Sequence, residues 1–84
     1  MLDKLRIKLK EFENEDVYVE IKGALQFHIT IKSAKILISN QKVFITNEKE
    51  QDFIIELYYL DNIEIEGNAI YLQMQNDIEI MLDY

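Results

Sequence analysis

Hydrophobic and polar residues alternate most regularly in the C-terminal third of the chain. The alternation runs through residues 63–66, 69–74 and 78–82, which two short segments containing Gly67, Asn68, Asn76 and Asp77 separate. Successive strand residues point to opposite faces of a sheet, and Gly, Asn and Asp favour tight turns. The pattern therefore predicts a three-stranded antiparallel meander. Its inward side chains are expected to be Ile63, Ile65, Ile70, Leu72, Met74, Ile78, Ile80 and Leu82, and its outward ones Glu64, Glu66, Tyr71, Gln73, Asp77, Glu79 and Asp83.

The middle of the chain also has the period of strands. Residues 17–21 and 25–31 alternate, with Lys22, Gly23 and Ala24 as a turn between them, and Leu25, Phe27, Ile29 and Ile31 on one half-buried face. Residues 35–38 and 42–46 follow, joined at a hairpin where Asn40 tolerates a positive φ. Residues 36–38 and 43–45 are apolar at every position. We expect these two strands to be covered on both sides or to expose an interface.

Two segments allow more than one interpretation. Residues 2–14 place Leu2, Leu5, Leu9 and Phe12 on one helical stripe, although residues 5–10 also alternate as a strand would. We favour the helix, because Leu2 and Phe12 fit only that period. Residues 53–60 favour a strand by their β-branched and aromatic content. The alternative is a helix, with Asn47 and Glu50 as a capping box before it.

These elements predict a mainly β protein with one N-terminal helix. A chain of 84 residues forms a single domain, with the helix at residues 2–14 and an antiparallel sheet of about seven or eight strands at 17–84. So long a sheet would leave open edges if it stayed flat. We expect a curved sheet that rolls into a small barrel or folds into two layers.

The net charge of −7 is unevenly distributed along the chain. Residues 1–49 hold all nine Lys and Arg and seven acidic residues, whereas residues 50–84 hold nine acidic residues and no Lys or Arg. The second segment would repel nucleic acid and anionic membranes, so its natural partner is a basic protein surface. The alternative is that the acidic residues only keep a small β protein soluble.

Candidate catalytic residues are few. The chain has no Cys, and His28 is its only histidine, on the outward side of an expected strand. Neither Ser33 nor Ser39 lies in a nucleophile-elbow pattern. The carboxylate pairs Glu64/Glu66 and Asp77/Glu79 share a solvated face, unlike the two different environments of acid–base catalysis. We therefore predict a non-enzymatic protein, with no cofactor and no metal site.

Tyrosines accompany the carboxylates of the C-terminal segment and supply contact area with a polar tip. We predict a partner-binding set of Glu56, Tyr58, Glu64, Glu66, Tyr71, Asp77 and Glu79. Such a set could imitate the charge pattern of nucleic acid and dock on a basic, nucleic-acid-binding protein. In size and acidity the chain resembles nuclease inhibitors, immunity proteins and phage anti-defence proteins. A cytoplasmic location is expected, since the N-terminal residues lack the apolar segment of a signal peptide.

A second function follows from the apolar strands at residues 36–45. They indicate a structural module that assembles with itself as a homo-oligomer. The strand pattern of residues 36–82, in particular at 36–45 and 60–65, is similar to that of bacterial PH/GRAM-like domains. A helix before a strongly bent small barrel is similar to Sm-like proteins. These resemblances imply a compact β-barrel for the self-assembling alternative.

Overall fold

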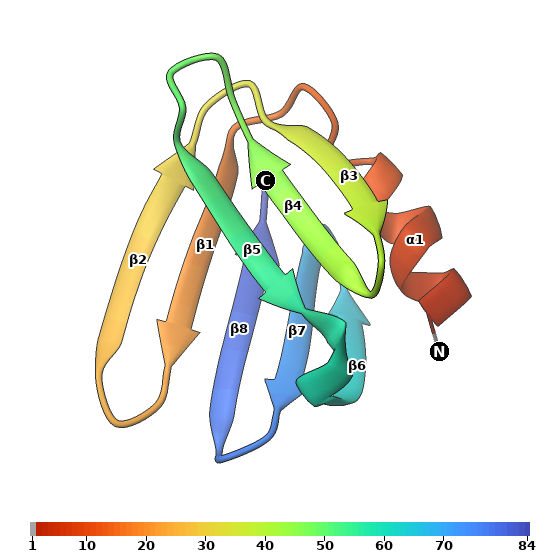
Figure 1. Ribbon diagram of the computed structural model, residues 1–84, viewed down its shortest axis with the longest axis vertical. Helices are drawn as coiled ribbons and strands as arrows, with labels where there is room; N and C mark the ends of the chain where they lie inside the picture. The colour runs from red at the N-terminus through yellow and green to blue at the C-terminus, as the bar shows by residue number, and fades with distance from the viewer. Residues whose placement is uncertain (1) are drawn as a thin grey trace.

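The computed structural model describes residues 2–84. One short helix precedes eight strands, and a single 3-10 turn interrupts the strands near the middle of the chain (Figure 1). The elements are α1 (Leu2–Lys10), β1 (Val17–Lys22), β2 (Gln26–Ile31), β3 (Lys35–Ser39), β4 (Lys42–Thr46), β5 (Asp52–Glu56), the 3-10 turn η1 (Leu57–Tyr59), β6 (Leu60–Glu66), β7 (Ala69–Met74) and β8 (Ile78–Asp83). The fold is mainly β, as the sequence predicts.

The strands form two antiparallel sheets. The first has five strands in the order β2-β1-β8-β7-β6, and the second has three in the order β3-β4-β5. Figure 1 shows the smaller sheet in front of the larger one, with α1 beside β3. The sheets are not closed into a barrel, so the two-layer expectation is confirmed and the barrel alternative is wrong.

The core lies between the inner faces of the two sheets. Each strand contributes every second residue, such as Val17 and Val19 from β1 and Val43 and Ile45 from β4. The expected inward residues Ile70, Leu72, Ile80 and Leu82 of the meander are buried, although the edge-strand residues Ile63 and Ile65 are only partly covered. Burial of these alternating side chains is the main stabilising contribution to a chain of this size.

Helix α1 closes one side of the core. Leu5 and Leu9 are buried, whereas Ile7 is 67% exposed. A strand through these residues would have put all three on one face, so this burial pattern explains why the segment is helical. The helix ends at Lys10, four residues before the expected end. Asn14 takes a φ of 67°, and its amide donates to the Ala34 carbonyl at 2.8 Å.

The segment 53–60 is mostly strand, as favoured from its composition, and the alternative of a capped helix is wrong. Strand β5 ends at Glu56, and residues 57–59 form only one 3-10 turn before β6. Asn47 caps no helix. Its side-chain oxygen instead accepts hydrogen bonds from the amides of Lys49 (3.1 Å) and Gln51 (3.0 Å) within the β4–β5 loop.

Strand β2 is less buried than its alternation indicates. Ile31 is fully buried, but Phe27 is 53% exposed and Leu25 is 83% exposed. The register Ile21↔Phe27 does place Phe27 on the inner face. However, β2 is an edge strand, and in Figure 1 its hairpin with β1 extends past the end of the smaller sheet. The expectation of a half-buried face therefore fails at this end.

Within residues 2–84, no helix has the length and apolar character needed to cross a membrane.

Candidate functional site

The outer face of the five-stranded sheet collects acidic side chains from three of its strands. We call this surface the acidic face and define it by five carboxylates and two aromatic rings: Glu20, Glu64, Glu66, Glu79, Asp83, Tyr18 and Tyr71. The strand register fixes their common orientation, because residues paired across a sheet point to the same side. One Lys, Lys22, lies on the same face.

One row of this face crosses the whole sheet. Glu20 of β1 pairs with His28 of β2 and with Met81 of β8, Met81 pairs with Tyr71 of β7, and Tyr71 pairs with Glu64 of β6. Neighbouring strands lie about 4.8 Å apart, so the row extends roughly 19 Å. Carboxylates therefore lie on both sides of a central Met–Tyr pair, which is the apolar part of this surface.

Hydrogen bonds and one ion pair hold several of these side chains. Lys22 Nζ lies 3.5 Å from a Glu20 oxygen, and the Tyr18 hydroxyl donates to the other Glu20 oxygen at 3.3 Å. Gln73 donates from its side-chain amide to the Glu79 carboxylate. Burial and the adjacent Glu20 carboxylate raise the pKa of Tyr18 above its usual value, so the hydroxyl keeps the proton that it donates to Glu20 to a higher pH than a free tyrosine would.

The structure brings together most of the predicted partner-binding set. Glu64, Glu66, Tyr71 and Glu79 all lie on the acidic face, and Asp77 lies in the turn between β7 and β8 at its end.

Glu56 and Tyr58 lie elsewhere in the structure. Glu56 forms an ion pair with Lys42 (3.3 Å) on the smaller sheet. Tyr58 is 72% exposed in η1, where its ring packs edge to face against Tyr59 with centroids 5.2 Å apart. These two residues therefore do not extend the acidic face.

Sequence reasoning missed Tyr18 and Glu20 as members of this face. Their outward orientation is visible in the alternation of residues 17–21, because Val17 and Val19 are apolar. Their position beside the meander is not visible, because it depends on the pairing of β1 with β8 across about 60 residues of chain. Only the register Tyr18↔Asp83 and Glu20↔Met81 adds them to the carboxylates of the C-terminal half.

His28 and the two candidate serines do not come together. His28 is exposed on β2, with its ring centroid 5.6 Å from that of Tyr18. Ser39 ends β3 in the other sheet, and the Ser33 amide donates to Asp16 Oδ1 at 3.0 Å. Among residues 2–84, no group of three His, Asp or Glu side chains is arranged to hold a metal ion.

The outer face of the three-stranded sheet has the opposite character. Its central row consists of Leu37, Phe44 and Ile54, one residue from each strand. Leu37 is 60% exposed and Ile54 is 47% exposed. No element within residues 2–84 covers this row, so the expectation that both strands are covered on both sides is wrong, and the interface stays a prediction.

We compared the chain with protein-family models, with curated proteins and with solved structures, and none of them matches.

Proposed function

We propose that this protein is a non-enzymatic binding module whose acidic face docks on a basic protein surface. The supporting observation is the convergence of five carboxylates from β1, β6 and β8 on one face that carries a single Lys. Chain segments far apart in sequence contribute to that face. Solubility alone requires acidic residues on the surface, but it does not require that they lie together on one face.

The composition of the face suits a protein partner. Tyr71 and Met81 form a central pair with carboxylates around it, which is the usual arrangement of an apolar interface centre inside a polar rim. Carboxylates accept paired hydrogen bonds from Arg, and tyrosine rings stack on its guanidinium group. A surface rich in Arg and Lys is therefore the complementary partner.

Nucleic-acid-binding proteins present surfaces of this kind to phosphates. We infer that the protein inhibits such a partner by occupying its phosphate-binding surface. Direct binding of nucleic acid or of an anionic membrane by the acidic face is disfavoured by charge repulsion. We place this activity in the cytoplasm, where a protein without Cys loses nothing to the reducing conditions.

The test is an affinity capture with two charge-matched variants. In Glu64→Lys/Glu66→Lys the acidic face loses two exposed carboxylates. In the control Glu48→Lys/Glu50→Lys, two exposed carboxylates of the β4–β5 loop change in the same way. Proteins captured from host lysate are identified by mass spectrometry, and circular dichroism checks that both variants fold. The proposal expects a basic partner that the control retains and the acidic-face variant loses.

A competition experiment tests whether the protein occupies the phosphate-binding surface of the partner. Duplex DNA or RNA added to the captured complex should displace the protein, because both would occupy the same basic surface. Salt should also weaken the complex, since rim charges are screened within about 8–10 Å at physiological ionic strength. A partner that both variants retain equally, and that nucleic acid does not displace, would exclude the acidic face as the docking surface.

A second candidate function is self-assembly through the row of Leu37, Phe44 and Ile54. Its supporting observation is the exposure of Leu37 and Ile54 on either side of the half-buried Phe44, on a sheet face that no element within residues 2–84 covers. Sedimentation analysis should then give a homo-oligomer for the natural protein and a monomer for Leu37→Ser/Ile54→Ser. A natural protein that is monomeric at micromolar concentration would exclude this function.

A further inference from the structure

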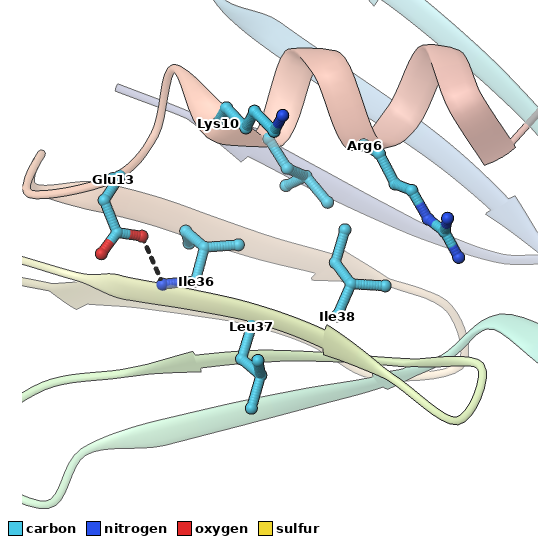
Figure 2. Close-up of a pocket in the computed structure, with 7 residues that line it drawn as sticks. Arg6, Lys10, Glu13, Ile36, Leu37 and Ile38 are labelled. Atoms are coloured by element: carbon cyan, nitrogen blue, oxygen red, sulfur yellow. Dashed lines mark hydrogen bonds between the residues drawn. The ribbon is translucent and has the colours of Figure 1, made fainter.

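A groove separates helix α1 from the edge of strand β3, on a part of the molecule that shares no residue with the acidic face. Its volume is about 600 Å³, and ligand pockets generally measure about 300–1,000 Å³. Leu9, Ile36 and Ile38 supply apolar lining, and Arg6 and Lys10 lie on the helical side (Figure 2). We refer to it as the α1–β3 groove.

Two cations of this groove have no acidic partner. Arg6 and Lys10 are four residues apart, so they project from the same side of α1. Within residues 2–84, neither forms an ion pair, whereas Lys8 on the same helix pairs with Glu11 at 3.2 Å. The lining also holds one acidic residue, Glu13, so its formal charge is +1 in a protein with a net charge of −7, and Arg6 and Lys10 are the groups that favour an anionic ligand.

The β3 side of the groove presents unpaired backbone groups. Glu13 Oε2 accepts a hydrogen bond from the Ile36 amide at 2.8 Å, so this amide points away from β4. Backbone groups alternate in direction along an antiparallel strand, and the amide and carbonyl of Ile38 therefore point to the same edge. No described side chain accepts a hydrogen bond from the Ile38 amide. A carboxylate thus already occupies one edge amide, and the next one is open.

Figure 2 shows how these groups are arranged along the groove. Glu13 and Ile36 lie at one end, and Arg6 lies at the other end near Ile38. The side chains of Ile36 and Ile38 point toward the helix, whereas Leu37 points to the opposite face of the strand. A ligand in the groove would therefore contact apolar side chains, open backbone groups of β3 and two cations at once.

We propose that the α1–β3 groove binds an extended, acidic segment of a partner protein, which adds to the edge of β3. The open amide and carbonyl of Ile38 match the backbone of an added strand, as in other cases of strand addition. Arg6 and Lys10 match a carboxylate side chain that points to the helical side. The apolar neighbours of that carboxylate alternate to the opposite side, where they match Leu37, which also lines the groove. Unlike a lipid, a peptide fulfils all three conditions.

The proposed site is independent of the acidic face and has the opposite charge preference. The acidic face selects Arg and Lys, whereas the groove selects Asp and Glu. One protein could thus hold a basic surface and an acidic segment at the same time. Loss of either activity leaves the other measurable.

The test is a titration of ¹⁵N-labelled protein followed by NMR. The probe is the peptide acetyl-Val-Glu-Val-Glu-Val-amide, and its matched control replaces both Glu by Gln. The proposal expects saturable shift changes at the amides of Arg6, Lys10 and Ile38 with the Glu peptide. The Gln peptide should bind about tenfold more weakly, because it lacks the charge-assisted hydrogen bonds.

Two variants with the same change in charge test whether Arg6 and Lys10 contribute to peptide binding. Arg6→Gln/Lys10→Gln should raise the Kd of the Glu peptide about tenfold, since two charge-assisted contacts are removed. Lys32→Gln/Lys49→Gln changes two exposed Lys outside the groove and should leave the Kd unchanged. All four side chains are exposed, so both variants should fold. An equal effect of the two variants would overturn the groove as the site.

Strand addition is tested on the peptide, which avoids any change to the protein. Only alternate residues of an added strand direct their backbone groups to β3. A peptide N-methylated at its two Glu residues and one N-methylated at its three Val residues should therefore differ, with one binding and the other not. Equal binding of both would overturn strand addition. Saturable binding of sodium decanoate at these amides, without binding of the peptide, would overturn the peptide as occupant.

Discussion

Phe12 and Tyr84 pack edge to face, with ring centroids 4.7 Å apart and ring planes at 69°. Phe12 follows helix α1 and Tyr84 follows strand β8, so the contact joins the two ends of the fold through residues that are 72 positions apart in the chain. The Tyr84 hydroxyl also donates to Glu11 Oε1 at 3.1 Å. Together these contacts fix the turn after α1 to the central part of the larger sheet.

Replacement of Phe12 should strongly destabilise the fold. Its side chain is fully buried, and Phe12→Ala should lower the free energy of unfolding by about 3–5 kcal/mol. A domain of this length has about 4–13 kcal/mol in total, so the variant should be close to unfolding. Urea denaturation followed by circular dichroism measures the change. Phe27→Ala, at a side chain that is 53% exposed, is the matched control and should lose clearly less.

The two partly buried tyrosines predict a loss of stability at alkaline pH. Burial, together with a neighbouring carboxylate, raises the pKa of Tyr18 and of Tyr84 in the folded protein. The unfolded chain therefore releases these protons first, from about pH 10 upward, and unfolding becomes easier as the pH rises through the folded pKa values. Below about pH 10 both tyrosines make their full contribution to the free energy of unfolding. Thermal melts between pH 8 and 11 should show a falling Tm, with a smaller fall in Tyr18→Phe/Tyr84→Phe.

One substitution in the β3–β4 turn should raise the stability of the fold. Asn40 and Gln41 have φ values of 50° and 61°, between strands that pair at Ser39↔Lys42. Two positive φ values in a two-residue hairpin favour Asn-Gly, and Gln has to adopt a left-handed conformation that costs about 1–2 kcal/mol. Replacement by Gly removes this cost, but the greater entropy of Gly in the unfolded chain offsets about 0.5–1 kcal/mol of the stabilisation. Gln41→Gly should therefore raise the urea midpoint modestly, and Gln41→Ala should not.

Asn47 connects the β4–β5 loop to the segment before β3. Its side-chain oxygen accepts from Lys49 and Gln51, and its side-chain amide donates to the Lys32 carbonyl at 3.2 Å. Asn47→Ala should cost about 1–2 kcal/mol, since several hydrogen bonds are lost at a partly exposed site. Asn47→Asp keeps the acceptor and should lose less. Hydrogen exchange at the Gln51 amide should be faster in the Ala variant than in the Asp variant, and equal rates would contradict this role.

The local alternation of the sequence predicted the individual strands well. The meander of β6, β7 and β8 follows it closely, because tight turns leave antiparallel neighbours no other register. The hairpin expected at Asn40 is present, and Asn40 has a φ of 50°. The helix agrees with the favoured interpretation of residues 2–14, although it ends at Lys10. After Lys10 the amides of residues 11–13 donate to carbonyls three residues back, as in a turn, and Asn14 has a positive φ.

Non-local pairing could not be predicted in the same way. No pattern within residues 17–22 indicates that β1 lies between β2 and β8, and this placement adds Tyr18 and Glu20 to the acidic face. The sequence pattern also does not indicate which apolar residues are exposed at the edges of the sheets. Phe27 and Leu37 belong to regular apolar patterns, yet Phe27 is exposed on the edge strand β2 and Leu37 lies on the uncovered face of the smaller sheet.

The order of strands in the larger sheet has a consequence for folding kinetics. Strand β8 lies between β1 and β7, so the hairpin of residues 17–31 and the hairpin of residues 60–74 have no shared partner until residues 78–83 take their place. Joining β1 to β8 closes a loop of about 60 residues, and such long-range contacts slow folding. We therefore expect two independent hairpins early in refolding, and a late, cooperative step in which β8 unites them.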